Sequence, residues 1–327
     1  MKAMVLNAVG KPLEMAEVDL PKMGPNDVLI KTIACGVCRT DLHIVDGELP
    51  SPKLPLILGH QVVGKIEAVG ENVRRFQPSD LVGASWLGNT CHCCEYCLED
   101  KENLCDGAVF TGYHKNGGYA EYCAAHEDYI FALPKNYRAE ELAPMLCAGL
   151  IGYRAYRLTQ KPKKIGLYGF GSSAHLLIQL ATAHKHDIYV FTRPNDTKTQ
   201  EFALSLQAKW AGGSDQSPPV LLDAAILFAP DGSLYPKALK DLKKGGIVIS
   251  AGIHMSDIPS FPYQLLWEER VMTSVANLTR KDGEEFFSLL KTTPIRPKTH
   301  TYPLKDANIA LQAIRTGALE GSAVLLL

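Results

Sequence analysis

Residues 165–174 run Ile165-Gly-Leu-Tyr-Gly-Phe-Gly-Ser-Ser-Ala174, and this stretch decides the fold of the second half of the chain. The apolar run predicts a short buried strand, and residues 172–184 predict a helix directly after it. The turn between them fits G-x-G-x-x-G/A, in which two glycines allow a tight turn and a close approach of a pyrophosphate to backbone. A small third residue lets the helix pack closely on the strand. We therefore predict a dinucleotide-binding turn made by Gly169, Gly171, Ser172, Ser173 and Ala174.

The chain after this turn alternates between two hydrophobic periods. Further buried strands are predicted at residues 188–191, 224–228 and 246–250, and another helix at residues 197–207. Alternating helices and apolar strands are typical of a parallel, doubly wound sheet. This context favours a ligand-binding role for the glycine-rich turn over a βα turn without a ligand.

The residue that follows the second strand selects between the two nicotinamide dinucleotides. An acidic residue there would hold the adenosine ribose and favour NAD, whereas this chain has Thr192 and Arg193. A hydroxyl and a guanidinium suit a 2′-phosphate, so the sequence favours NADP over NAD. The simpler alternative is that Arg193 only faces solvent. Gly252 and Ile253, after the strand at residues 246–250, complete the predicted cofactor site.

The first part of the chain has a different pattern. Residues 1 to about 135 are rich in glycine and proline and contain short alternating runs, which predicts a barrel-like β unit. Residues 139–158 have helical composition and carry Cys147. The tail from about residue 281 predicts a helix at residues 283–291, a proline-rich connection, and a final helix and strand.

Composition excludes several classes of function. The chain has 327 residues, enough for about two domains, and its 34 Lys and Arg balance 35 Asp and Glu. It therefore lacks the basic surplus expected for nucleic-acid or membrane surfaces. We find no apolar run of about 18 residues and interpret the N-terminus as a strand rather than a signal peptide. Nine cysteines, seven of them in two short windows, favour reduced thiols, metal binding and a cytoplasmic location.

The first cysteine window is Cys35-Gly-Val-Cys38-Arg-Thr40-Asp41-Leu-His43, and Gly59-His60 follows shortly after it. Thiolate and imidazole together suit Zn²⁺, and a hydroxyl beside a metal can pass a proton. A Cys-x-x-Cys pair by itself is ambiguous, because it also suits a redox dithiol or two buried thiols.

The second window, residues 91–105, has the spacing C-x2-C-x2-C-x7-C. The regular spacing selects Cys91, Cys94, Cys97 and Cys105 and leaves Cys93 as a spare thiol. Four thiolates so close in sequence predict a closed, tetrahedral structural zinc site. An iron–sulfur cluster is the chemical rival, but nothing else in the chain indicates one-electron chemistry.

Taken together, these motifs resemble the zinc-dependent, medium-chain alcohol dehydrogenases of the medium-chain dehydrogenase/reductase superfamily. The resemblance covers essentially the whole chain and rests on the two cysteine windows, Gly59-His60, residues 145–149 and the turn at residues 169–174. It implies an α/β fold with a GroES-like β-barrel catalytic domain at residues 1–150, including a structural zinc lobe at about residues 88–106. It further implies a Rossmann domain at residues 151–278 and a C-terminal segment, residues 279–327, that returns to the catalytic domain.

The resemblance also implies roles for individual residues. Cys38, His60 and Cys147 would bind a catalytic zinc and leave a fourth position open for water or substrate. Thr40 would take the alcohol proton, and the nicotinamide ribose and then His43 would carry it to solvent, with a surface histidine as the simpler alternative for His43. Asp41 would accept a hydrogen bond from His60 and fix its tautomer. Cys35 would then be a packing residue.

One departure from the family pattern follows His60. The family commonly has Glu at the next position, where this chain has Gln61. A neutral amide cannot supply a nearby negative charge, so we expect a slightly more electrophilic zinc and slower ligand exchange, with the reaction type unchanged.

The expected activity is reversible hydride transfer between a small or medium alcohol and its aldehyde or ketone, with two Zn²⁺ per chain and NADP or NAD. A polyol or sugar dehydrogenase remains an alternative, as does a zinc-free quinone or enoyl reductase on the same scaffold. A non-enzymatic metal or redox module is the third class. No nucleic-acid or membrane partner is expected, and relatives suggest a homodimer or homotetramer.

Overall fold

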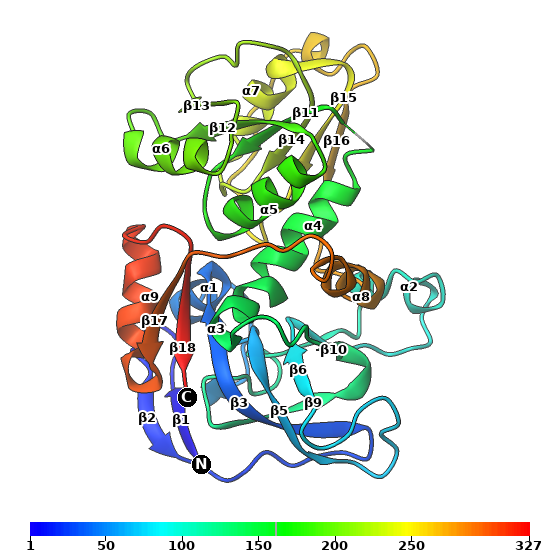
Figure 1. Ribbon diagram of the computed structural model, residues 1–327, viewed down its shortest axis with the longest axis vertical. Coiled ribbons are helices and arrows are strands. Elements are labelled where there is room, and N and C mark those ends of the chain that lie inside the picture. The colour runs from blue at the N-terminus through cyan, green and yellow to red at the C-terminus, as the bar shows by residue number, and fades with distance from the viewer. Residues whose placement is uncertain (161) are drawn as a thin grey trace. The chain divides into compact units, whose positions relative to one another are not determined.

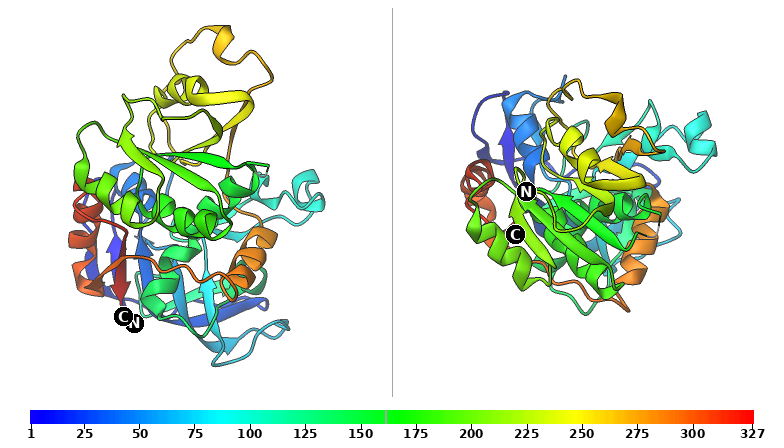
Figure 2. Two further views of the ribbon diagram at one scale, coloured as in Figure 1. Left: turned by 45° about the horizontal axis from the view of Figure 1, so that its top comes forward. Right: turned by 90° about the horizontal axis from the view of Figure 1, so that it is seen from above.

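The computed structural model describes residues 1–160 and 162–327. The chain forms two compact units, one made of Met1–Leu150 with Asn277–Leu327 and the other of Ile151–Ala276. Both chain ends lie close together in the first unit (Figures 1 and 2), where the backbone N–H of Leu327 donates to Ile33.

The first unit is built on a mixed sheet with the strand order β10-β6-β5-β3-β18-β17, and β9 also pairs with β3 (Figure 1). Its long central strand is β3, Asp27–Val37, whose residues are almost all buried, with Lys31 the exposed one. The other strands are β5 (Val62–Val69), β6 (Leu81–Ala84), β9 (Tyr122–His126), β10 (Ile130–Ala132), β17 (Thr299–Pro303) and β18 (Ser322–Leu326). The C-terminal strand β18 pairs antiparallel with β3, so the tail of the chain completes the sheet that the N-terminal half begins.

Smaller elements surround this sheet. A three-stranded sheet contains β1 (Lys2–Leu6), β2 (Glu14–Glu17) and β4 (Leu56–Ile57), and a two-stranded one contains β7 (Leu87–Asn89) and β8 (Val109–Phe110). The helices of eight or more residues that lie wholly in this unit are α1 (Arg39–Asp46), α8 (Arg280–Leu289) and α9 (Ala307–Thr316), among the described residues. Helix α8 begins earlier than the sequence predicts, because Thr279 and Asp282 form a capping box at its N-terminus.

The predicted helix at residues 139–158 is broken in the structure. It consists of α3 (Ala139–Leu142), a 3₁₀ turn (Ala143–Leu146) and α4 (Ala148–Arg157). Pro144 lies in the first turn of the 3₁₀ segment and has no backbone N–H to continue the hydrogen bonding of α3, which fits the interruption. Cys147 lies at the junction with φ −134° and ψ −70°, so its thiol projects from an irregular link rather than from a helix.

The second unit is a six-stranded, all-parallel sheet with the order β13-β12-β11-β14-β15-β16. Its strands are β11 (Lys164–Tyr168), β12 (Asp187–Thr192), β13 (Trp210–Gly213), β14 (Leu222–Leu227), β15 (Leu242–Ser250) and β16 (Val271–Ser274). Among the residues described, the α-helices that lie wholly in this unit are α5 (Ser172–Ala183), α6 (Thr197–Ser205) and α7 (Leu234–Asp241), and most of α4 also belongs to it. The order, with the first strand in the middle and the chain reversing there, is that of a Rossmann sheet and confirms the predicted fold class.

The core of this sheet is apolar and aromatic. The rings of Tyr168 and Phe191 stack at 4.0 Å on neighbouring strands. The Tyr168 hydroxyl donates to the buried Asp241 carboxylate at 2.6 Å, which satisfies the polar end of a fully buried side chain.

Candidate metal centres and cofactor site

Cys38 is held at the point where a strand becomes a helix. It follows β3 directly and is the N-cap residue of α1, with extended backbone at φ −137° and ψ 179°. The Asp41 carboxylate accepts from the Cys38 backbone N–H at 2.8 Å, which is the side-chain half of a capping box. Helix α1 was not predicted, although an acidic residue three positions after a candidate cap is a signal for a helix start.

His60 is fully buried behind a crowded glycine. Gly59 has φ +96°, and a Cβ there would lie 2.4 Å from the Tyr119 ring and 2.8 Å from the Cys35 sulfur. The indole of Trp86 packs edge-on against the His60 ring with centroids 5.0 Å apart. These contacts fix the direction of the imidazole.

Cys38, His60 and Cys147 converge from three separate segments, with one ligand atom of each within 4.8 Å of the others. The Cys38 sulfur lies 3.3 Å from His60 Nε2. A hydrogen bond from Cys147 is the main cause that lowers the pKa of Cys38 well below its usual range, with further lowering by His60 and Thr40 against the effect of burial. Burial alone would lower the pKa of His60, but the Cys38 thiolate and the Asp41 carboxylate raise it to about 10.

Two soft sulfur donors and one imidazole nitrogen match the ligand preference of Zn²⁺. The atoms behind them fit as well, because Asp41 Oδ1 lies 3.5 Å from His60 Nδ1 and neither atom has a hydrogen-bond partner among the described residues. A histidine that binds metal through Nε2 carries its proton on Nδ1, where it can be donated to a carboxylate. The donors, and the orphaned atom pair behind them, therefore fit a zinc ion.

Thr40 and His43 lie three residues apart on α1, a spacing that places two side chains on the same helix face. His43 is only 8% exposed, and its Nδ1 hydrogen-bonds to the Glu48 carboxylate. The alternative of an ordinary surface histidine is therefore wrong. Glu48 was not singled out by the sequence, because only the turn after α1 brings it back to His43.

Cys35 and Gln61 flank the group without belonging to it. Cys35 is fully buried on β3, and its sulfur packs where a Cβ on Gly59 or Gly118 would lie. The Gln61 side chain lies against Gly36, where a Cβ would be 2.6 Å from Oε1. Cys35 thus lies outside the group that contains Cys38, despite their Cys-x-x-Cys spacing.

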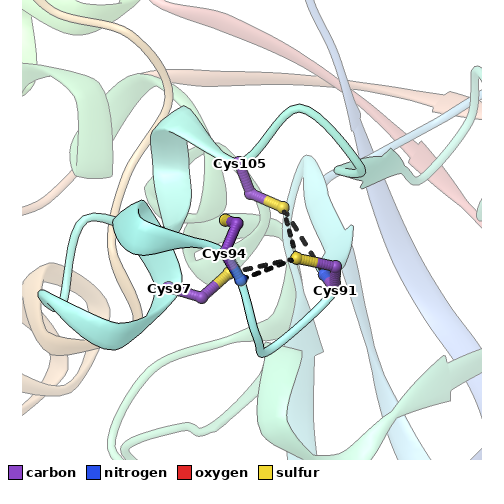
Figure 3. A group of neighbouring side chains, drawn as sticks. All are labelled: Cys91, Cys94, Cys97 and Cys105. Atoms are coloured by element: carbon purple, nitrogen blue, oxygen red, sulfur yellow. Dashed lines mark hydrogen bonds between the residues drawn. The ribbon is translucent and has the colours of Figure 1, made fainter.

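The second group gathers the four thiols of Cys91, Cys94, Cys97 and Cys105 (Figure 3). The Cys91 sulfur lies 3.5 Å from that of Cys105 and 3.9 Å from that of Cys97. Backbone N–H groups of Cys93 and then Cys94 are the main causes that lower the pKa of Cys91 to about 6. A short helix, Glu95–Leu98, begins directly after Cys94 and turns Cys97 back toward Cys91. Four closely spaced thiols fit one tetrahedral metal ion, and Cys93 lies outside the group.

The four-cysteine lobe is anchored to the start of α8. The buried Glu102 accepts from the Arg280 backbone N–H at 2.7 Å and pairs with its guanidinium at 3.3 Å. The Asn277 side chain donates to the Asn103 carbonyl at 3.2 Å. These bonds connect the lobe to the returning C-terminal segment of the same unit.

A third group, His92, His126 and Asp128, also brings possible ligand atoms within 4.8 Å. His126 Nδ1 already accepts from the Asp128 backbone N–H at 3.2 Å. The Asp128 carboxylate faces two guanidinium groups, Arg75 at 3.7 Å and Arg280 at 4.0 Å. This charge pairing disfavours a cation, so we assign the group to surface electrostatics.

The glycine-rich turn lies between β11 and α5, as expected. Gly169 packs against Ala229, whose backbone nitrogen would be 2.8 Å from a Cβ. Gly171 is different, because a Cβ there would meet no atom within 4 Å. It is also the N-cap of α5 and offers no side-chain acceptor to the helix N–H groups. Open space over an uncapped helix N-terminus fits a phosphate, and the fully buried Ala174 allows the close packing behind it.

The polar residues at the end of β12 and just after it have different roles. The buried Thr192 hydroxyl accepts from Gln200 at 3.0 Å and donates to the Arg193 carbonyl at 2.9 Å, so it holds the turn together. Asp196 is the N-cap of α6 and accepts from the Thr199 backbone N–H at 3.1 Å. Arg193 is exposed and forms no ion pair with a described residue. Gly252 and Ile253 follow β15, and Ile253 is half exposed.

The sequence of this chain is similar to those of known alcohol dehydrogenases. A family model described as the alcohol dehydrogenase GroES-like domain matches residues 24–135. The chain is 44% identical over 324 residues to the probable alcohol dehydrogenase AdhA of Mycobacterium tuberculosis (strain CDC 1551 / Oshkosh), covering 97% of this chain and 93% of the relative. No helix within residues 1–160 and 162–327 has the length and apolarity needed to cross a membrane.

Two solved structures have the same fold over almost their whole length. The CAD from Helicobacter pylori, complexed with NADP(H), has a TM-score of 0.89 and 26% identity, covering 99% of this chain and 97% of that chain. The acetophenone reductase from Geotrichum candidum NBRC 4597, in complex with NAD, has a TM-score of 0.88 and 27% identity, covering 99% and 96%.

Proposed function

Because this chain belongs to the medium-chain alcohol dehydrogenase family, we propose that it is a zinc-dependent alcohol dehydrogenase that interconverts alcohols with aldehydes or ketones. The observation that carries the proposal is the convergence of Cys38, His60 and Cys147 from three segments, with Asp41 facing His60 Nδ1. A redox dithiol of Cys35 and Cys38 has no such support, since the two thiols lie in different surroundings.

In the proposed reaction, Cys38, His60 and Cys147 hold the zinc ion and Asp41 orients His60. Zinc in such a site acts as a Lewis acid toward the substrate oxygen, and a nicotinamide exchanges hydride with the substrate carbon. Thr40 takes the alcohol proton at its hydroxyl and His43 carries it toward solvent, with the reverse transfer in carbonyl reduction. Burial of His43 and the hydrogen bond at its Nδ1 hold the ring in one orientation.

Cys91, Cys94, Cys97 and Cys105 hold a second, structural zinc ion in this proposal. All four thiols are used, so no position is left for substrate. Glu102 and Asn103 bond the four-cysteine lobe to the α8 segment, so an ion that holds the lobe together also stabilises this part of the unit.

The cofactor is a nicotinamide dinucleotide, and the end of β12 supports NADP as the preferred form. Arg193 has its guanidinium available, while Asp196, the nearest acidic residue in the sequence, is engaged as a helix cap. A charge-assisted hydrogen bond to the 2′-phosphate contributes about 1.5–3 kcal/mol. We expect Arg193→Ala to lower kcat/KM for NADPH by about 10-fold to 100-fold while that for NADH changes little. An unchanged ratio between the two cofactors refutes the assignment.

A metal assay combined with a substrate panel tests the central proposal. The purified protein is analysed for zinc, and oxidation of NADPH and NADH is followed against a panel of aldehydes and ketones. Two zinc ions per chain and turnover are expected, with Cys38→Ser losing one zinc and the activity. Cys35→Ser is the matched control, because that thiol is buried nearby but outside the metal group, and it should keep both. Turnover of quinones or enones by zinc-free protein favours the reductase alternative instead.

Location and assembly remain predictions. Nine free cysteines support a reducing compartment such as the cytoplasm. Strand β16 is an edge strand of the six-stranded sheet with partly exposed side chains, which supports a homodimer or homotetramer built on this edge.

A further inference from the structure

Tyr119 is among the largest fully buried side chains of the described residues, and it lies beside the segment that carries His60. Three backbone hydrogen bonds of 2.8–3.0 Å join residues 117–119 to residues 57–59. The Tyr119 ring fills the space in which a Cβ on Gly59 would lie, only 2.4 Å from a ring carbon. The backbone pairing and the absent Cβ together fix this ring against the residue that precedes His60.

The hydroxyl at the end of the Tyr119 ring is buried without a partner. It meets no group of the described chain at hydrogen-bond geometry. Burial is the main cause that raises the pKa of Tyr119 well above its usual range, and the charge of Asp41 adds to the effect. The phenol therefore keeps its proton and is a donor at neutral pH. An unpaired donor in this position costs free energy that the ring of a phenylalanine would not cost.

The carboxylate oxygen left free for this donor is Asp41 Oδ1. The Asp41 carboxylate acts on Tyr119 as a charge and as a hydrogen-bond acceptor, through a contact that falls short of full hydrogen-bond geometry. Oδ1 lies 3.5 Å from His60 Nδ1 and has no bonded partner in the part of the chain that the structure describes. The nearby Cys35 thiol is directed instead at the Gly36 carbonyl, at 3.7 Å. A carboxylate oxygen can accept from two donors, so the tyrosine hydroxyl and the imidazole N–H can share Oδ1.

We propose that Tyr119 is a positioning residue of the Cys38–His60–Cys147 site: its hydroxyl donates to Asp41 Oδ1 and holds that oxygen in place for His60 Nδ1. This role rests on the proposed function, in which these three residues bind zinc. The other oxygen of Asp41 already accepts from the Cys38 backbone N–H at 2.8 Å. With a bond on each oxygen the carboxylate cannot rotate, so the histidine keeps an acceptor behind it when Nε2 binds metal.

Tyr119→Phe tests the hydroxyl alone, because it keeps the buried ring. Zinc affinity is measured by competition with a chromophoric chelator, without substrate or cofactor. Loss of an outer partner of a metal-binding histidine lowers affinity by about 10-fold or more. Since Tyr119 acts through Asp41, we expect a loss of about 10-fold at the Cys38–His60–Cys147 site and no change at the four-cysteine site.

Tyr137→Phe is the matched control for the loss of a buried tyrosine hydroxyl. The Tyr137 hydroxyl accepts from the Ile295 backbone N–H at 3.1 Å, in the same unit, and Tyr137 belongs to neither metal group. This variant should bind zinc at both sites with the affinities of the wild type.

Two results with Tyr119→Phe overturn the proposed role. If both sites keep the zinc affinity of the wild type, the hydroxyl contributes only to packing. If both sites lose affinity, the hydroxyl supports the whole unit rather than one ligand. Wild-type protein that binds no zinc through Cys38, His60 and Cys147 refutes the proposed function itself, and the role of Tyr119 falls with it.

A double-mutant cycle tests whether Tyr119 acts through Asp41. In Asp41→Asn protein, Tyr119→Phe should change the zinc affinity of the Cys38–His60–Cys147 site by less than about 2-fold, because the acceptor that the hydroxyl uses is already altered. An equal loss of affinity in both backgrounds would show that Tyr119 acts independently of Asp41, and it would overturn the proposed role.

Discussion

Asp41 links two predicted zinc ligands, and its replacement gives the sharpest test of the metal centre. One carboxylate oxygen accepts from the Cys38 backbone N–H at 2.8 Å, and the other faces His60 Nδ1 at 3.5 Å. The side chain is fully buried, and burial raises the pKa of its carboxyl, against the opposing effect of His60. An uncharged substitute of the same shape therefore changes the hydrogen bonding with little change in volume.

In Asp41→Asn the amide can satisfy only one of the two contacts. If its oxygen accepts from Cys38, its NH₂ group faces the Nδ1–H that His60 carries when Nε2 binds metal, so two donors oppose each other. Loss of such a partner behind a metal-binding histidine typically lowers metal affinity 10-fold to 100-fold. This corresponds to about 1.4–2.8 kcal/mol.

Zinc affinity is measured by competition with a chromophoric chelator in the wild type and the Asp41→Asn variant. The four-cysteine site supplies an internal reference, since it should release zinc equally in both proteins. Asp46→Asn is the matched control, because this carboxylate is on the same helix but pairs with Arg315. If the Asp41→Asn protein is folded and its Cys38–His60–Cys147 site keeps the zinc affinity of the wild type, the role assigned to Asp41 is wrong.

Three further predictions concern the surroundings of the metal centre and the core. Gly59→Ala forces a Cβ to 2.4 Å from the Tyr119 ring at φ +96°, and should lower the free energy of unfolding in urea by about 2–4 kcal/mol; a loss below about 1 kcal/mol would show that the loop can move aside. Burial raises the pKa of Cys123 from 9.0 to about 11, so the folded protein keeps the thiol proton up to a higher pH than the unfolded chain does. The free energy of unfolding should therefore fall by about 3 kcal/mol as the pH rises from about 9 to about 11. Unfolding measured across that range should show a smaller fall for Cys123→Ala, and parallel curves would refute the linkage. Gln61→Glu restores the charge common in the family and should speed zinc exchange and alter kcat; if isotope exchange of zinc and steady-state kinetics are unchanged, position 61 does not tune the metal.

The local patterns of the sequence were sufficient for much of the fold. A parallel sheet leaves continuous apolar strands, so β11 and β12 could be predicted and are confirmed, as is the position of the glycine-rich turn between β11 and α5; the binding of a phosphate there stays a prediction. The spacing of Cys91, Cys94, Cys97 and Cys105 is likewise local, and the structure brings these four thiols together. Strands β13 and β16 and helix α7 were missed, because short or weakly patterned segments become regular only by pairing and packing with neighbours.

Tertiary structure decided what the first cysteine window does. Spacing alone pairs Cys35 with Cys38, but β3 buries Cys35 in the core while the capped start of α1 directs Cys38 toward His60 and Cys147. The junction at Cys147 depends on a helix break that composition did not predict.

The hydrogen bond from His43 to Glu48 depends on the left-handed turn at Gly47, and no side-chain periodicity encodes it. The sequence by itself thus determined which chemical groups are present and where several of the regular elements lie. Only folding determined which of these groups meet, because contacts between distant segments depend on packing, backbone handedness and burial rather than on spacing.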